Sequence, residues 1–547
     1  MNKHPRSIII IGFIACTALS QIQSEEIPHF TDELDPVLLA HRLIDVMDNR
    51  EVLGQVLMFG YDGQAPDRNI MRWIKEFNLG GVKIFGWNAE DLTLLAETVS
   101  VYQEIALGSR FGIPLLIATD QEGGWVRHIK GWTSITPGNM ALGADPVPGD
   151  SLDTGRLIAR ELAAVGVNMN FAPTVDVFSD PRAEVIAPRT FTADPYWTGI
   201  LGLAFIKGQE EFGVISTAKH YPGHGDTSED SHGTLPIVHA DINTLRNRDL
   251  IPYRMIIQGG LPAIMAGHLA FPLIENERLP ATLSKYFLTT LLREELSFDG
   301  VVITDDLFMH GARIENTPAH QICYLAMMAG ADILLISHGN RNHREIINRF
   351  INEMSDNELF AKRVREAAYR VMKMKLQWLK GPNAVSYHPK PPQEMLSADG
   401  SYGFLLTQAA RSITLVRNRR FPIKREDAGR VLVAGTYQDF FIEGKRRYPK
   451  AKTWLIDYAE TKQGLQRNGR NLAQAAARYD TVIALVADTE TAILLNELEK
   501  IANRVVVISV LSPTHLDTLD WAQTALAVYG TGRESFRAAF AALFGDF

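Results

Sequence analysis

The chain has 547 residues, more than one ordinary domain needs, so its length predicts about two to four domains. With 46% hydrophobic and 22% charged residues, the composition is that of a globular protein and excludes extended disorder. The formal net charge of -8, without a long run of one sign, argues against a nucleic-acid-binding protein.

The N-terminus has the pattern of a bacterial-type export signal. Lys3 and Arg6 precede the apolar run SIIIIGFIACTALS, and small residues follow near Ser20. The run is short for a membrane-spanning helix, so we predict a signal peptide over residues 1–24 and an exported protein, periplasmic, envelope-bound or secreted. Cys16 in FIAC weakly resembles a lipoprotein attachment site, which leaves a lipid anchor as an alternative.

The chain has only two cysteines, Cys16 and Cys323. If Cys16 leaves with the signal or carries a lipid, the mature protein has one thiol and no internal disulfide. Cys323 lies in the apolar helical pattern QICYLAMMAG, which indicates a buried small hydrophobic residue rather than a nucleophile.

Eight short apolar runs alternate with amphipathic segments between about residues 51 and 380. Strands that are buried on both faces have continuous apolar runs of this kind. Eight strand–helix units predict an α/β fold with a (β/α)8 TIM-type barrel over residues 25–380. The predicted strands are QVLMFG, GGVKIFG, PLLIATD, NMNFAPT, VISTAKH, PAIMAGH, VVITDD and DILLISH.

Polar residues follow directly after several of these predicted strands. In a parallel barrel the carboxyl ends of the strands converge on one face, where the loops build the active site. Several chemically capable side chains at the same end therefore indicate a site rather than simple strand ends. They are Asp120, Lys219, His220, His268, Asp305, Asp306 and His338.

A second domain is predicted after the barrel. A final barrel helix is expected in SDNELFAKRVREAAYRVMKMKLQWL, with Ser355 as its cap and Glu358 three residues later. The proline-rich residues 381–400 indicate a linker. Residues 401–547 contain five apolar runs and a last helix, RESFRAAFAALFG, which predict a smaller αβα sandwich without a phosphate-loop pattern.

The segment KHYPGHGDTSEDSH, residues 219–232, concentrates histidines, carboxylates and glycines. His220 and His224 would share a helix face as metal ligands, but Pro222 and Gly223 lie between them and disfavour a helix. A phosphate loop is disfavoured because Lys219 precedes the glycines instead of following them. A solvated loop or acid/base machinery remains, and the position after the fifth predicted strand favours the latter.

Two features of this region suit glycosidase chemistry. In an extended segment Asp230 and His232 project to the same side, so the carboxylate can orient the imidazole for proton transfer. Asp305 ends the predicted strand of FDGVVITDDLFMHGA, and because adjacent residues alternate sides, we assign Asp305 to chemistry and Asp306 to capping the next helix. A carboxylate nucleophile and a proton donor are the minimum for a retaining glycosidase.

The strings KHYPGHGDTSEDSH, TDDLFMHGA, DQEGGWVRHI, NFAPTVDV and PRTF, taken together, resemble glycoside hydrolase family 3, and within it the NagZ-type β-N-acetylglucosaminidases. The resemblance covers residues 45–380 and implies Asp305 as nucleophile, His232 as general acid/base and Asp230 as its partner. It further implies sugar contacts from Asp120, Arg189, Lys219 and His220, with no metal or organic cofactor.

The resemblance implies a retaining exo-β-N-acetylglucosaminidase that acts on peptidoglycan fragments, with muropeptides that carry terminal N-acetylglucosamine as its expected substrates. A monomer is expected, with a membrane contact only through a lipid anchor. Alternatives are phosphorolysis, another family 3 β-glycosidase, or a wall-sugar binding protein without turnover. His128 stands where relatives commonly have an arginine, so it receives no role, and Trp125 is either core packing or a sugar platform.

Overall fold

The computed structural model describes residues 27–227, 229, 231, 233–275, 278–337, 340–396 and 401–547. The predicted signal peptide and Cys16 lie outside these residues. Among the described helices, none combines the length and the apolar character that crossing a membrane requires.

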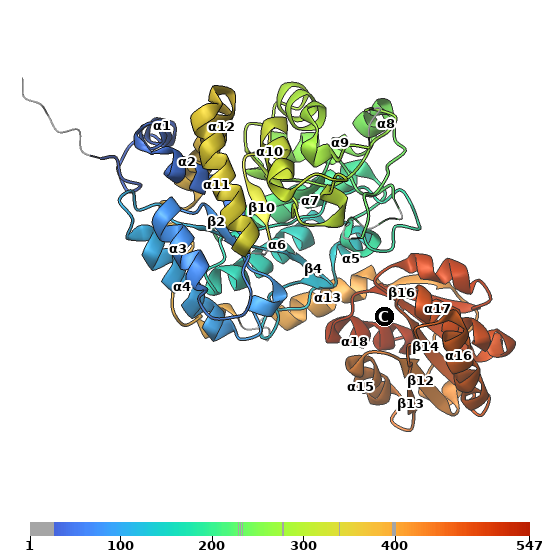
Figure 1. Cartoon of the computed structure of the whole chain (residues 1–547). Coiled ribbons are helices and arrows are strands. Elements are labelled where there is room, and N and C mark those ends of the chain that lie inside the picture. The colour runs from blue at the N-terminus through green and yellow to red at the C-terminus, as the bar shows by residue number, and fades with distance from the viewer. Residues whose placement is uncertain are drawn as a thin grey trace, which may run out of the picture.

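The first domain is an eight-stranded parallel sheet that curls into a barrel (Figure 1). Its strand order is β10-β1-β2-β3-β6-β7-β8-β9, and a parallel bridge between Ile303 and Ile333 brings the two ends together. The (β/α)8 prediction is confirmed, because each predicted run overlaps one of these strands. They are β1 (Leu57–Phe59), β2 (Gly81–Lys83), β3 (Leu116–Thr119), β6 (Met169–Asn170), β7 (Ile215–Tyr221), β8 (Ala263–Ala266), β9 (Val301–Thr304) and β10 (Leu334–Ile336).

Helices cover the outside of the barrel and shield the apolar strands from water (Figure 1). Every residue of β1, β3 and β9 is buried, which explains why these strands have continuous apolar sequences. The covering segments are α1 (Pro36–Val46), α2 (Asn49–Gln55), α3 (Arg68–Phe77), α4 (Leu92–Leu107), α5 (Asn139–Ala144), α6 (Pro148–Ala164), α7 (Pro195–Glu210), α8 (Ile242–Asn247), α9 (Leu250–Gln258), the π-helix η4 (Tyr286–Glu295), α10 (Ala319–Ala329), α11 (Asn340–Asp356) and α12 (Glu358–Trp378).

The start of the last barrel helix differs from the prediction. Asn357, rather than Ser355, is the N-cap of α12, and its side chain accepts a hydrogen bond from the Phe360 backbone. Ser355 is still inside α11 and donates to the Ile351 carbonyl. Asn is as good a cap as Ser, so the sequence allowed both positions and the length of α11 decided between them.

Cys323 lies on α10 and is fully buried, as its apolar surroundings predicted. Burial raises the pKa of its thiol well above the ordinary range, which keeps the sulfur protonated at neutral pH.

The second domain is a six-stranded sheet of order β11-β16-β15-β14-β12-β13 with an apolar core on each face. The five predicted runs form β12 (Val431–Gly435), β13 (Lys452–Leu455), β14 (Thr481–Val486), β15 (Val505–Val510) and β16 (Thr524–Tyr529). The αβα prediction is confirmed, with α13 (Tyr402–Ser412), α14 (Arg425–Ala428), α15 (Gln438–Arg447), α16 (Lys462–Ala476), α17 (Thr489–Leu495) and α18 (Arg533–Phe544) as its helices.

The strand β11 (Thr414–Arg417), which pairs antiparallel with β16 at the sheet edge, was not predicted. Its residues are largely exposed, so it lacks the continuous apolar run of a buried strand. The predicted linker, residues 381–400, is described up to residue 396 and includes a short helical turn, η6 (Gln393–Met395). Its role as a linker stays a prediction.

The second domain meets the barrel through the carboxyl end of β16 (Figure 1). Met140 and Ala141 of α5 and Ala187 form one buried apolar cluster with Ala527 and Tyr529. At the same junction the hydroxyl of Thr489 donates to the Glu184 carboxylate, from the start of α17 to a barrel loop. The barrel loop that follows β6 is therefore supported by the second domain.

Candidate active site

A cavity of about 510 Å³ lies at the carboxyl ends of the barrel strands. Five of the predicted site residues line it, and they come from separate parts of the chain. Asp120 follows β3, and Asp305 follows β9. Lys219 and His220 lie near the carboxyl end of β7, and Arg189 ends a short helical turn, η2 (Ala187–Arg189), in the loop after β6. The structure thus brings together four residues predicted from strand ends and Arg189, which the family resemblance implied.

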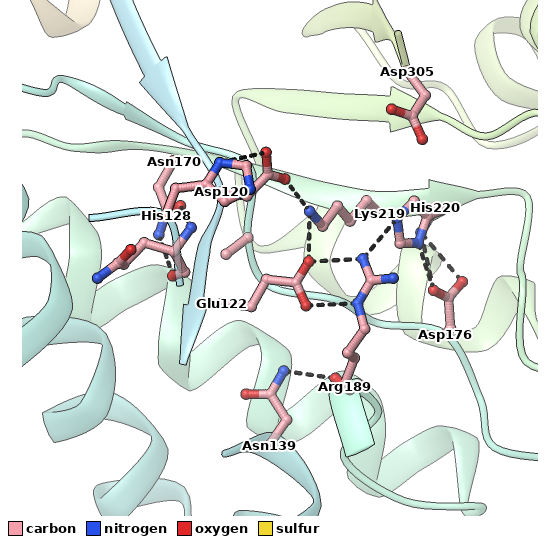
Figure 2. Close-up of polar contacts among 12 residues, drawn as sticks. Asp120, Glu122, His128, Asn139, Asn170, Asp176, Arg189, Lys219, His220 and Asp305 are labelled. Atoms are coloured by element: carbon pink, nitrogen blue, oxygen red, sulfur yellow. Dashed lines mark hydrogen bonds and ion pairs between the residues drawn. The ribbon is translucent and has the colours of Figure 1, made fainter. Parts of the chain in front are cut away.

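Asp120 lies between two buried lysines, Lys219, which Figure 2 shows beside it, and Lys83. Its Oδ1 atom is 2.5 Å from Lys219 Nζ, and its Oδ2 atom is 2.5 Å from Lys83 Nζ. Burial would raise the pKa of Asp120, but the charges of Lys219 and Lys83 outweigh it and hold the pKa well below its usual range. The carboxylate is therefore ionised and fixed in orientation at the cavity wall.

Glu122 joins Lys219 to Arg189 (Figure 2). Its Oε1 atom is 2.6 Å from Lys219 Nζ and 2.7 Å from Arg189 Nη2, while its Oε2 atom accepts from Arg189 Nε at 2.9 Å. Burial works against ionisation, yet Arg189 and Lys219 lower the pKa of Glu122 to about 2. The bidentate contact fixes the plane of the guanidinium and leaves Glu122 almost no freedom.

His220 is held from both ring nitrogens (Figure 2). Its Nδ1 atom lies 2.8 Å from Asp176 Oδ2, and its Nε2 atom lies 3.1 Å from Arg189 Nη2. Since arginine can only donate, Nε2 must accept, which assigns the proton to Nδ1 and leaves the imidazole neutral. Asp176 also accepts from the backbone of His224 at 2.7 Å, so it is fully satisfied.

Asp305 stands apart from this network and points into the same cavity (Figure 2). Its Oδ1 atom accepts a hydrogen bond from the Asp306 backbone at 2.8 Å. Burial would raise its pKa, but His268 and Lys219, together with that hydrogen bond, lower it below the ordinary value. Asp305 is thus an ionised carboxylate, and no hydrogen bond from a described residue occupies its second oxygen.

Asp306 differs from the prediction in detail. Its Oδ1 atom accepts from the backbones of Phe308 and Ser337, both at 3.1 Å, so it orders a turn instead of capping a helix. His268, also predicted at this rim, is buried: its ring bonds to Thr282 Oγ1 and to the Asp306 carbonyl. His338 lies outside the described residues.

The proposed acid/base pair, Asp230 and His232, also lies outside the described residues. The residue between them, Ser231, lines the cavity, and its carbonyl accepts from the Gly311 backbone at 3.0 Å. Ser231 thus brings a described residue of this segment to the cavity.

The metal interpretation of His220 and His224 finds no added support. Their ring centroids are 5.7 Å apart, and one nitrogen of His220 is engaged by Asp176. Within the described ranges, no group of three or more His, Cys, Asp or Glu side chains is arranged to hold a metal ion.

Two aromatic side chains at the mouth of the cavity remain accessible. Trp125 is 47% exposed, which is not compatible with core packing, and Trp87 is 44% exposed and stacks on Phe85 at 4.4 Å. His128 also lines the cavity, with Nδ1 3.3 Å from Lys83 Nζ. Burial and the charge of Lys83 lower the pKa of His128 to about 4, so this imidazole is neutral.

Lys83, Glu122 and Asp176 are the members of the site that sequence reasoning missed. Lys83 ends β2, so its position at a strand end was an available signal. Glu122 and Asp176 lie within DQEGG and NFAPTVDV, yet only their pairing with Lys219, Arg189 and His220 reveals their importance.

Comparison with known proteins decides the family. Residues 48–374, more than half of the chain, match the Glycosyl hydrolase family 3 N terminal domain. The chain belongs to glycosyl hydrolase family 3. The family resemblance noted in the sequence and the two-domain α/β architecture are both confirmed.

Within family 3, the curated relatives and the solved structure described below are all named as hexosaminidases or N-acetylglucosaminidases. The chain is 36% identical over 324 residues to the Beta-hexosaminidase A of Pseudoalteromonas piscicida, covering 55% of this chain and 54% of that protein. It therefore spans about half the length of that relative. It is 34% identical over 273 residues to a Beta-hexosaminidase of Pseudomonas aeruginosa, covering 50% and 78%.

A solved structure matches both domains. It is a glycoside hydrolase family 3 beta-N-acetylglucosaminidase from Paenibacillus, with a TM-score of 0.82 and 27% identity over 92% of this chain and 97% of that one. The second domain of this chain is therefore part of an architecture that this family 3 enzyme shares.

Proposed function

We propose that the protein is a retaining exo-β-N-acetylglucosaminidase that releases terminal β-linked N-acetylglucosamine from peptidoglycan fragments. The observation that carries the proposal is Asp305, an ionised carboxylate with one oxygen that no described residue engages, beside a fixed network of donors and acceptors. The names of the family 3 relatives support the sugar and the reaction class.

The network suits recognition of a single sugar ring. Asp120 presents a carboxylate, while Lys219 and Arg189 present charged donors, and all of them are held by partners before a ligand arrives. Preorganised groups of this kind bind hydroxyl and amide groups without a further ordering cost, and they orient the anomeric carbon over Asp305.

The proposed reaction has two displacements. In the first, an Asp305 oxygen bonds to the anomeric carbon while the bond to the leaving oxygen breaks, and His232 donates its proton to that oxygen. In the second, His232 removes a proton from water, whose oxygen displaces Asp305. Asp230 orients His232, and each displacement inverts the anomeric carbon, so the β configuration is retained.

The chemical test uses p-nitrophenyl β-N-acetylglucosaminide. Asp305→Ala is expected to lower kcat by roughly 10⁴-fold or more, and added azide should restore turnover with an α-glycosyl azide as product. Undiminished turnover in the variant, or an initial α-product from the unaltered enzyme by NMR, would contradict the mechanism. Sugar 1-phosphate formed in phosphate buffer would instead identify a phosphorylase.

The substrate test compares a muropeptide that carries terminal N-acetylglucosamine with chitobiose. We expect the higher kcat/KM for the muropeptide if peptidoglycan fragments are the substrate. A preference for chitobiose would restrict the proposal to a general N-acetylglucosaminidase. Export to the cell envelope belongs to the proposal too, and mass spectrometry of the mature N-terminus tests cleavage near residue 24 and lipidation of Cys16.

A further inference from the structure

The second domain contains a hollow of about 670 Å³ at the amino ends of its parallel strands, on the side away from the barrel. The hollow lies where β12, β13 and β14 begin, since Arg430, Lys452 and Tyr479 line it. The carboxyl end of the same sheet contacts the barrel through Tyr529 and through Thr489. The hollow is therefore separate from the catalytic cavity.

Its lining is strongly cationic. Five of its residues are lysine or arginine, and no aspartate or glutamate lines it; the five are Arg425, Arg430, Lys450, Lys452 and Arg478. From Arg417 to Lys452 the chain has eleven Lys or Arg residues and only four Asp or Glu, against a net charge of -8 for the whole protein. The hollow is thus lined largely from a positively charged stretch of a chain that is negative overall.

Most of this charge has no internal counter-charge. Arg430 pairs with Asp480, Nε to Oδ2, at 3.1 Å, and Arg425 donates to the Arg447 carbonyl. No ion pair joins Lys450, Lys452 or Arg478 to a carboxylate in the second domain, all of which is described from residue 401 onward. Cations that converge on one hollow and lack partners attract anions.

The floor of the hollow is apolar and aromatic, which favours a ligand larger than a single inorganic anion. Tyr448 is buried and donates its hydroxyl to the Ile423 carbonyl, and Val431 and Ala451 are buried beside it. The hollow is much larger than one inorganic anion, and Tyr479 and Pro449 add apolar surface against which a sugar ring can pack.

We propose that this basic hollow binds an anionic glycan, a polysaccharide that carries carboxylates or phosphates, and so holds the enzyme on a charged polymer away from its catalytic cavity. The choice of a glycan over another polyanion rests on the proposed function. The inference that the hollow binds an anion rests only on its lysine and arginine residues.

The test measures binding to the full-length protein by calorimetry. Oligogalacturonate and a phosphomannan serve as carboxylate and phosphate probes, with chitotetraose as the neutral probe and polyglutamate as an acidic peptide. We expect one or both anionic glycans to bind at least roughly tenfold more tightly than chitotetraose, with affinity that falls as salt is added. The probe that binds more tightly identifies the charged group.

Matched charge reversals locate the binding. Lys450→Glu/Lys452→Glu/Arg478→Glu should abolish it, and the Gln triple at the same positions should weaken it if the reversal fails to fold. Lys462→Glu/Arg467→Glu/Lys500→Glu changes the net charge equally at the opposite end of α16 and should leave binding intact. Equal loss in both triples, or equal binding of polyglutamate, overturns the proposal.

Hydrolysis of p-nitrophenyl β-N-acetylglucosaminide should be unchanged in all of these variants. The two proposals can fail separately. If the protein binds anionic glycans but does not hydrolyse the chromogenic substrate, the proposed function is wrong and the basic site stands. If it hydrolyses the substrate but binds none of the anionic glycans, the basic site is wrong and the proposed function stands.

Discussion

Glu122 accepts two hydrogen bonds from Arg189, one to each carboxylate oxygen, at 2.7 and 2.9 Å. The same carboxylate is 2.6 Å from Lys219, so one buried acid positions two groups that the proposed sugar site requires. Breaking a buried ion pair by removing one partner is costly because the other charges remain buried without compensation.

Glu122→Gln is therefore expected to lower kcat/KM for p-nitrophenyl β-N-acetylglucosaminide by roughly 100-fold. The matched control is Glu211→Gln, which alters a bidentate pair with Arg156 that is exposed to solvent. Exposed pairs contribute little, so the control should keep its activity and its melting temperature. Comparable activity in both variants would show that Glu122 does not organise the site.

Glu161 predicts a stability that depends on pH near neutrality. Burial raises its pKa to about 7, although hydrogen bonds from Ser134 oppose the shift. The folded state thus binds the proton more tightly than the unfolded state, so this contribution is complete below about pH 4.5 and is lost as pH rises toward 7. We expect Glu161→Gln to gain stability relative to the unaltered protein on going from pH 5 to pH 8, on the order of 3 kcal/mol.

Urea unfolding at the two pH values measures this difference. Glu122 supplies a comparison of opposite sign, because its pKa is lowered to about 2. Its stabilisation is present above about pH 4.5 and is lost as pH falls toward 2, so Glu122→Gln should show no comparable change between pH 5 and 8. A difference for Glu161→Gln that does not vary with pH would contradict the prediction.

The contact between domains predicts a remote effect on substrate binding. Ala527 of β16 belongs to the buried cluster that contains Ala187, two residues before Arg189. Ala527→Leu overpacks this cluster at a cost of about 1–3 kcal/mol and should displace η2. We expect KM for the chromogenic substrate to rise roughly fivefold or more, with a smaller change in kcat.

Val528→Leu is the matched control for Ala527→Leu. Val528 is equally buried but belongs to the core on the other face of the sheet. It should lower the melting temperature of the protein without changing KM. Equal KM values in the two variants would show that this contact of the second domain does not affect substrate binding.

The exposure of Trp125 predicts a role in contacts beyond the first sugar. Trp125→Ala should lower kcat/KM for chitooligosaccharides by roughly fivefold, about 1 kcal/mol of lost stacking, and should change p-nitrophenyl β-N-acetylglucosaminide hydrolysis less. Trp132→Ala serves as control, since Trp132 is 56% exposed but does not line the cavity. Losses of the same size for both substrates would contradict a platform at this position.

Much of the fold was predictable because each barrel strand is buried on both faces. Threonine is the only polar residue in the runs VVIT and LIAT, and each run forms a fully buried strand. The exposed strand β11 lacked this signal and was missed. Ser355 and Asn357 are both good caps, so local sequence could not choose between them.

The residues of the candidate site also fall into two groups, those that the sequence could predict and those that it could not. Asp120, Lys219 and Asp305 were found because strand ends in a parallel barrel converge on one face, a consequence of topology that sequence periodicity reveals. Glu122 and Asp176 matter because they neutralise charges that lie far away in the chain, and no local pattern records such a partner.

The sequence by itself therefore determined the barrel, the second α/β domain and the strand ends that line the cavity, because burial and period are local properties. Only the tertiary structure decided that Asp120 lies between two lysines, that Glu122 holds Arg189, and that the second domain packs against the loop carrying that arginine. Charge pairing and domain contact depend on distances in space, which the order of residues along the chain does not contain.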